Sequence, residues 1–148
     1  MDMLKRILLA EDDSRDLELT LTALESHNLA NEVAVVRDGA QALDYLYRRG
    51  KFADRPEGNP AVVLLDIKMP KINGLEVLSQ LKNDPTLKTI PVVVLTSSSE
   101  EPDLAKAYEL GVNAYVVKPV DFTQFIAAVK QIGGFWAVLN DPPRGCLR

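Results

Sequence analysis

The 148-residue sequence has little of several features that would indicate a special class of protein. Its one cysteine, Cys146, cannot form a disulfide within the chain, and it does not make a cysteine-based metal site on its own. No apolar run approaches the roughly 20 residues of a membrane span, and the run over residues 7–10 is too short for the core of a signal peptide. We therefore expect a cytoplasmic protein that does not contact membranes.

Positive charge is also scarce. The chain has 17 Lys and Arg against 21 Asp and Glu, a formal net charge of −4. Proteins that bind nucleic acid gather Lys and Arg to neutralise phosphates, so we expect no nucleic acid partner. The hydrophobic share of 47% and the charged share of 26% are ordinary for a globular protein, and the length suits one domain with one core.

The chain does have a regular alternation of two kinds of segment. Short runs rich in Val, Ile and Leu predict strands, and because these runs are apolar throughout, they suit strands that are covered on both faces. They lie at residues 7–10, 33–36, 61–65, 91–95 and 114–117. The stretches between them have apolar residues at helical spacing, most clearly in a last stripe formed by Phe122, Phe125, Ile126, Val129 and Ile132.

Helix start signals agree with this alternation. Asn73 with Glu76, and Asp121 with Gln124, are typical of N-caps with a capping-box partner three residues on. Five strands alternating with five helices predict an α/β fold, a parallel sheet with helices on both faces. The polar stretch over residues 48–60 is predicted to be a surface loop.

Chemically active side chains follow four of the five predicted strands. They are Glu11 and Asp12 with Asp13, then Asp66, then Thr96 with Ser97, and finally Lys118 with Pro119. The carboxyl ends of parallel strands meet at one edge, which is where open α/β sheets bind their ligands. We therefore expect these residues to form one site.

Each group in this set has a physical role. Carboxylates from neighbouring strands repel one another unless a cation lies between them, and Mg²⁺ suits hard oxygen ligands. A bound metal would let a carboxylate oxygen of Asp66 act as nucleophile toward a phosphoryl group. Lys118 would add a second positive charge and Thr96 a hydroxyl donor. A structural alternative exists for each acid taken alone, and we expect Asp13 and Ser14 mainly to begin the first helix.

These motifs, with Met69, Pro70 and Gly74 downstream of Asp66, resemble the receiver domains of bacterial two-component response regulators over about residues 5–132. The resemblance implies a flavodoxin-like, doubly wound sheet of five strands in the order 2-1-3-4-5. It implies that Asp66 is the phosphoacceptor and that Mg²⁺ is held by Glu11, Asp12, Asp66 and the backbone carbonyl of Lys68.

The resemblance also assigns the remaining residues. Thr96, Ser97 and Lys118 would stabilise the phosphoryl group, and Thr96 with Tyr115 would form the switch that remodels the surface of the fourth helix and fifth strand. The bond between Lys118 and Pro119 would be cis. The chain would be a signalling protein rather than an enzyme, phosphorylated by a sensor histidine kinase and acting on an unidentified downstream protein.

Two features depart from a minimal receiver domain. The longer segment at residues 48–60 and the ending that contains Phe135, Trp136 and the pair Pro142-Pro143 resemble response regulators associated with phytochrome-type kinases. We expect a receiver domain at 1–132 and an extension at 133–148 without an output domain. Phe135, Trp136 and Leu139 would either pack on the domain itself or join two copies in a homodimer, which is the hypothesis we prefer.

Two other protein classes compete with this interpretation. A flavin-binding protein of the same topology needs a phosphate-binding loop rich in Gly, Ser and Thr after the first strand, where this chain has acids. An aspartyl-phosphate phosphatase has a second catalytic Asp two residues after the nucleophile, and Lys68 stands there.

Overall fold

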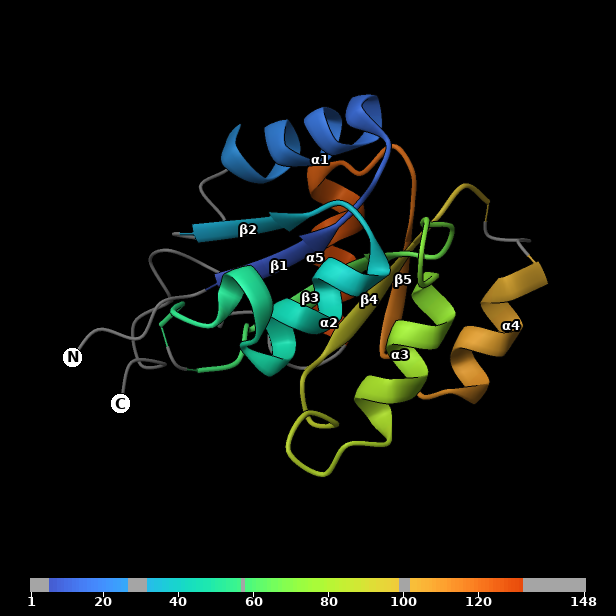
Figure 1. Cartoon of the computed structure of the whole chain (residues 1–148). Helices are drawn as coiled ribbons and strands as arrows, with labels where there is room; N and C mark the ends of the chain where they lie inside the picture. Colours follow the sequence, from blue (N-terminus) through green and yellow to red (C-terminus); the bar gives the residue numbers. More distant parts are fainter. Residues whose placement is uncertain (1–5, 27–31, 57, 99–101, 132–148) are drawn as a thin grey trace, which may run out of the picture.

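The computed structural model describes residues 6–26, 32–56, 58–98 and 102–131. Strands and helices alternate along the chain as predicted (Figure 1). The elements are β1 (Arg6–Ala10), α1 (Ser14–Ser26), β2 (Glu32–Val36), α2 (Gly39–Tyr47), η1 (Gly50–Phe52), β3 (Val62–Asp66), α3 (Gly74–Lys82), β4 (Val92–Thr96), α4 (Pro102–Glu109), β5 (Ala114–Val117) and α5 (Phe122–Gln131).

The strands form one parallel sheet in the order β2-β1-β3-β4-β5, which confirms the predicted fold class. Helices α1 and α5 cover one face and α2, α3 and α4 cover the other (Figure 1). Successive residues of a strand point to opposite faces, so each strand supplies both halves of the core. In β1, for example, Leu8 packs with α2 and α3, whereas Ile7 and Leu9 pack with α1 and α5.

Two strands begin and end one residue later than the apolar runs predicted. β3 includes Asp66 and β4 includes Thr96, and the register pairs Asp66 with Leu95 across the two strands. Pro91 precedes β4 and contributes only its carbonyl, which accepts from the Val63 N–H at 2.9 Å. Asp66 and Thr96 are therefore held by the ladder itself, and both are buried.

The described residues of the stretch 48–60 are mostly exposed, as predicted for a surface loop, but they include elements that a plain loop lacks. They contain the short helix η1, and the Phe52 ring lies edge-on to Tyr45 with 5.2 Å between centroids. The Arg55 guanidinium lies 4.2 Å from the centroid of the same Tyr45 ring, and its Nε donates to the Tyr45 carbonyl at 2.7 Å. Aromatic and cation–π contacts therefore attach this segment to α2.

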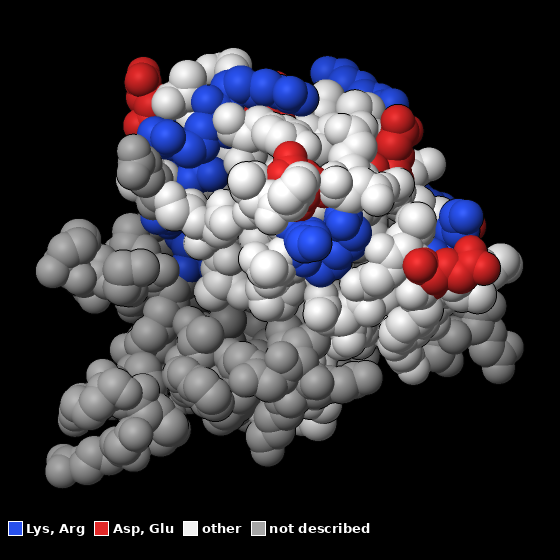
Figure 2. All heavy atoms as spheres, turned by 90° about the horizontal axis from the view of Figure 1, so that it is seen from below, with Lys and Arg blue, Asp and Glu red and all other residues white. Residues whose placement is uncertain are grey.

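The helix caps follow the sequence signals. Asp13, Asn73 and Asp121 each accept a hydrogen bond from the backbone N–H three residues on, at 2.8–3.0 Å. Among the described residues, no helix has the length and apolar character of a membrane span. The face drawn in Figure 2 carries basic and acidic side chains in separate small groups among uncharged ones, so its described part has no broad area of one sign.

Candidate functional site

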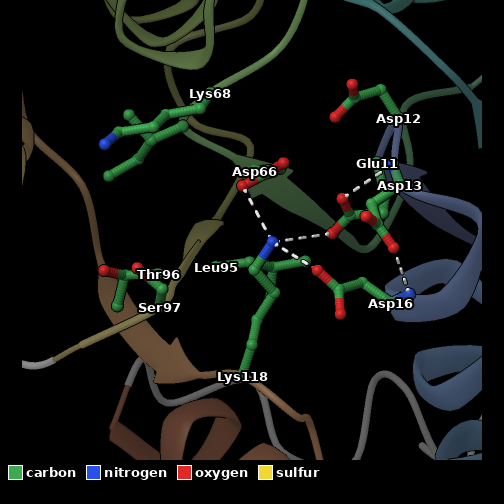
Figure 3. Close-up of a pocket in the computed structure, with 11 residues that line it drawn as sticks. Glu11, Asp12, Asp13, Asp16, Asp66, Lys68, Leu95, Thr96, Ser97 and Lys118 are labelled. Atoms are coloured by element: carbon green, nitrogen blue, oxygen red, sulfur yellow. Dashed lines mark hydrogen bonds and ion pairs between the residues drawn. The ribbon is translucent and has the colours of Figure 1, made fainter.

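A cavity of about 260 Å³ opens at the carboxyl edge of the sheet. It brings together side chains from the ends of β1, β3, β4 and β5 with the first turn of α1 (Figure 3). Its lining consists of Glu11, Asp12, Asp13, Asp16, Asp66, Ile67, Lys68, Leu95, Thr96, Ser97 and Lys118. Every residue predicted to hold the metal or the phosphoryl group lies in this lining.

Three carboxylates converge in the cavity. One oxygen from each of Glu11, Asp12 and Asp66 lies within 4.8 Å of the other two. The Glu11 side chain is fully buried and Asp66 is 5% exposed, whereas Asp12 lies nearer to solvent. Three acids this close, two of them buried, repel one another strongly when ionised.

The loop between β1 and α1 is held by backbone bonds and by one arginine. The Glu11 N–H donates to the Val36 carbonyl at 3.0 Å, and the Glu11 carboxylate accepts the Asp13 N–H at 3.2 Å. Nη2 of Arg37 donates to the Asp12 carbonyl at 3.0 Å and to the Ser14 hydroxyl at 2.9 Å. These contacts position the acids before any ligand arrives.

Lys118 supplies the positive charge in the centre of the site. Its Nζ lies 3.3 Å from Glu11 Oε1, 3.3 Å from Asp66 Oδ1 and 3.0 Å from Asp16 Oδ2 (Figure 3). The Lys118 side chain is only 15% exposed. Short ion pairs at this degree of burial favour the charged forms of Lys118, Glu11 and Asp66.

The backbone of Lys118 is fixed on both sides by Gln124. The Gln124 side chain accepts the Val117 N–H at 2.9 Å and donates to the Pro119 carbonyl at 3.1 Å. The Gln124 amide therefore does not form the capping box that the sequence predicted. It bonds to the Val117 N–H and the Pro119 carbonyl instead, because β5 ends here and these backbone groups need partners. The bond between Lys118 and Pro119 is cis.

The acid–base properties of the site reflect burial and charge together. Burial, and then the neighbouring charge of Asp66, raise the pKa of Glu11 from 4.5 to about 7. Burial also raises the pKa of Asp66, although Lys118 opposes the effect. Burial alone would lower the pKa of Lys118, but the bond to Asp16 and the charges of Asp66 and Glu11 outweigh it and raise that pKa.

The donor set fits a divalent cation. Glu11, Asp12 and Asp66 offer hard carboxylate oxygens, and a cation between them would remove the repulsion that raises the Glu11 pKa. Only a few carboxylates are present, which suits a metal that keeps several of its waters. Lys68 follows at the rim, where its exposed side chain extends away from the three acids (Figure 3).

Thr96 and Ser97 lie on the other side of Asp66 from the acidic pair (Figure 3). The Thr96 side chain is 2% exposed, and its hydroxyl donates to the Ser98 carbonyl at 2.8 Å. The same oxygen accepts the Ser98 N–H at 3.3 Å. The hydroxyl is therefore bonded to its own loop.

Tyr115 lies outside the cavity lining. It is half-buried on β5, and its ring meets that of Tyr108 on α4 edge-on, with 6.3 Å between centroids. It also lines a separate groove with Gln124, Ala127 and Ala128. The predicted contact residues Phe135, Trp136 and Leu139 lie outside the described residues.

Asp16 is the site residue that sequence reasoning missed. It stands in the first turn of α1, where an acid is expected at any helix N-terminus, so its type carried no distinct signal. Its position in the first turn of the helix that starts at the carboxyl edge of the sheet was the available clue. Arg37 was missed as well, since an isolated arginine after a strand indicates nothing by itself.

Comparison with known proteins agrees with the geometry of the site. Residues 7–130 match the family described as the response regulator receiver domain. The chain is 39% identical over 132 residues to the response regulator Rcp1 of Synechocystis sp., an alignment that covers 89% of this chain and 88% of Rcp1.

Solved structures of response regulators match the chain as well. The bacteriophytochrome response regulator RtBRR is 69% identical, with a TM-score of 0.86 and coverage of 97% of this chain and 86% of that one. The phosphorylated cyanobacterial phytochrome response regulator RcpA is 42% identical, with a TM-score of 0.74 and coverage of 90% and 94%. Rcp1 itself has been solved in a Mn²⁺-bound form, at 38% identity, a TM-score of 0.72 and coverage of 94% and 99%. The chain therefore belongs to the response regulator receiver domain family, among its phytochrome-associated members.

Proposed function

We propose that this protein is a phosphorylation switch in which Asp66 accepts a phosphoryl group from a sensor histidine kinase in a Mg²⁺-dependent reaction. The observation that carries the proposal is the placement of the buried Asp66 carboxylate, which lies 3.3 Å from the Lys118 ammonium and beside the acids Glu11 and Asp12. This arrangement combines a nucleophile, a cationic group and a set of metal ligands in one cavity.

In the proposed reaction an Asp66 carboxylate oxygen attacks the phosphorus of a phosphohistidine. An O–P bond forms, the P–N bond breaks, and its electron pair remains on the imidazole nitrogen. Mg²⁺ bound by Glu11, Asp12, Asp66 and the Lys68 carbonyl would supply positive charge beside the phosphoryl oxygens. Lys118 contributes a second positive charge that already lies beside Asp66, which lowers the barrier because this charge need not be brought to the acceptor during the step.

Asp66 must be ionised to attack. Burial favours its protonated form, whereas the Lys118 charge favours the carboxylate, and the two effects oppose each other at this residue. We infer that Lys118 has a role before the transfer as well as during it, because it keeps the nucleophile charged.

The proposed output is a change in a protein-interaction surface. Phosphorylation adds acceptor oxygens and negative charge next to Thr96, whose hydroxyl would exchange its bond to the Ser98 carbonyl for one to the phosphoryl group. Tyr115 would then turn inward and alter its edge contact with Tyr108 on α4. That surface would contact the downstream protein.

The proposed donor is a phytochrome-type photoreceptor kinase. The names of RtBRR and RcpA, which refer to bacteriophytochrome and to phytochrome, support this proposal. We also propose that residues 133–148 form an extension in which Phe135, Trp136 and Leu139 join two copies in a homodimer. The support for that part is the apolar character of these residues in the sequence.

Asp66→Asn tests the central proposal. Wild-type protein incubated with acetyl phosphate and Mg²⁺ should acquire one phosphoryl group that hydroxylamine removes, and the variant should acquire none because an amide is not a nucleophile here. Asp84→Asn is the matched control, since Asp84 bonds to Tyr47 and lies outside the cavity. Intact-mass spectrometry measures the product. Mg²⁺-dependent labelling of Asp66→Asn at the wild-type level would overturn the proposal.

A further inference from the structure

We propose that Asp16 is a positioning residue that keeps the Lys118 ammonium at the acceptor site while the other two partners of Lys118 are engaged elsewhere. This inference rests on the proposed function. Asp16 is the nearest of the three carboxylates to Nζ, at 3.0 Å, and it is the one that does not belong to the group of Glu11, Asp12 and Asp66.

The number of donors on Lys118 is the first argument. A lysine ammonium has three N–H donors, and here each meets a different carboxylate. With a cation bound, Glu11 would be one of its ligands, and in the proposed reaction Asp66 becomes an acyl phosphate whose negative charge lies on the phosphoryl oxygens instead of the carboxylate. Two of the three contacts of Lys118 therefore rearrange as the reaction proceeds, the one with Asp66 passing to the phosphoryl oxygens, whereas the contact with Asp16 can stay unchanged.

The attachment of Asp16 is the second argument. Its backbone N–H donates to Asp13 Oδ1 at 2.9 Å, so the residue is fixed by the cap of α1. Its carboxylate leaves the helix toward Lys118 (Figure 3). An acid in the first turn of a helix needs no partner beyond the helix dipole. The contact with a lysine 102 residues away is therefore an additional feature.

The space around Lys118 is the third argument. A second groove of about 370 Å³ adjoins the site and is lined by Arg15, Asp16, Leu19, Ser97, Lys118 and Pro119. Asp16 and Lys118 line both this groove and the cavity of Asp66, so their ion pair forms part of the wall between them. A lysine stem is long and flexible. Without Asp16, the ammonium could turn into the second groove and away from the acceptor.

Asp16→Asn tests the inference through the rate at which acetyl phosphate labels Asp66 in Mg²⁺. We expect a rate about tenfold lower than that of wild type, the size of effect for one charge-assisted contact. Asp16→Glu keeps the charge and should recover most of the rate. Glu18→Gln removes an exposed acid from the same helix and should leave the rate unchanged.

Two further measurements separate positioning from a structural effect. In a Lys118→Met background, Asp16→Asn should cause no additional loss, because a residue that acts through Lys118 has nothing left to position. In unphosphorylated protein, the NMR signal of the Lys118 ammonium should be protected from exchange in wild type and lost in Asp16→Asn.

A wild-type or faster labelling rate for Asp16→Asn, or an additional loss in the Lys118→Met background, would overturn the inference alone. Failure of wild-type protein to label on Asp66 would overturn the proposed function and this inference with it.

Discussion

Two lysines at opposite ends of the sheet have the same number of partners and different surroundings. Lys118, at the carboxyl edge, bonds to three carboxylates. Lys82, the last residue of α3, lies near the amino ends of β4 and β5 and bonds to three neutral oxygens. These are the carbonyls of Lys88 at 3.1 Å and Ile90 at 3.0 Å and the Asn113 side-chain oxygen at 3.3 Å.

The difference appears in the acid–base properties of the two lysines. Burial lowers the pKa of Lys82, and its neutral partners do not reverse the effect. The carboxylates around Lys118 do reverse it and raise the pKa of that lysine. Neutral oxygens suit a lysine that ties the loop before β4 to the residue before β5. Gathered carboxylates create a negative charge that a cation can balance, which suits the binding of metal and phosphoryl groups proposed for this end.

The largest effect predicted from this comparison concerns the labelling of Asp66. Lys118→Met should lower the rate of labelling by acetyl phosphate about 100-fold, because a positive charge already in position at the acceptor is lost. Lys82→Met removes a lysine that makes as many hydrogen bonds as Lys118 does. The rate of Asp66 labelling in this variant should stay within about twofold of wild type. Intact-mass spectrometry over time measures both rates. Equal losses in the two variants would show that the two ends do not differ in function.

A second prediction concerns pH in metal-free protein. Because the pKa of Glu11 is raised from 4.5 to about 7, the folded state between these values holds a proton that the unfolded chain releases. A rise in pH through this window therefore lowers the free energy of unfolding, on the order of 2 kcal/mol for this residue. Urea unfolding in EDTA at pH 5 and pH 8 measures the change, and Glu11→Gln should reduce it by that amount.

Lys82→Met provides the contrast for this prediction. It should destabilise the protein by about 1 kcal/mol through lost hydrogen bonds. The loss should be the same at pH 5 and pH 8, because the partners of Lys82 do not titrate. A strong pH dependence of the Lys82→Met effect, or an unchanged pH dependence in Glu11→Gln, would contradict the comparison.

The third prediction concerns Mg²⁺ and is smaller. At a Mg²⁺ concentration ten times the dissociation constant, binding to the folded state alone should add about 1.4 kcal/mol to the free energy of unfolding at pH 8. Asp12→Asn should lose most of this gain, whereas Lys82→Met should keep it, because Lys82 lies outside the cavity. Thermal unfolding with and without Mg²⁺ measures it. A full Mg²⁺ effect in Asp12→Asn would place the metal elsewhere.

The sequence predicts the carboxyl edge better than its opposite end. Glu11, Asp66, Thr96 and Lys118 each follow an apolar run in the sequence, and the carboxyl ends of parallel strands lie at one edge of the sheet wherever the helices pack. The residues that position them were harder to predict. Asp16 and Gln124 each fit an ordinary helix-start pattern. Only the folded structure shows that Asp16 bonds to Lys118 and that Gln124 bonds to the backbone on both sides of Lys118.

The Lys82 end could not be predicted for a related reason. Its partners are mostly backbone carbonyls, which every residue has, so no side-chain pattern marks the site. The segment at residues 48–60 shows the same limit, because its Gly and Pro content indicates a loop, whereas the packing of Phe52 and Arg55 on Tyr45 depends on where α2 lies. Patterns of charged and apolar residues predict the helices, the strands and the edge of the sheet where a site lies. Contacts between these elements cannot be predicted from such patterns, because they depend on the tertiary arrangement.

The smallest predicted effect would make the Lys82 end more like the Lys118 end. Asn113→Asp keeps the oxygen that accepts the Val92 N–H at 2.8 Å and replaces a neutral partner of Lys82 with a carboxylate. We expect the free energy of unfolding at pH 7 to rise by about 0.5 kcal/mol, the scale of a partly exposed ion pair. Urea unfolding measures it, and high salt should reduce it. The gain should vanish in a Lys82→Met background. A gain that persists there would have another origin, and a gain in the rate of Asp66 labelling would mean that charge at this end also reaches the acceptor.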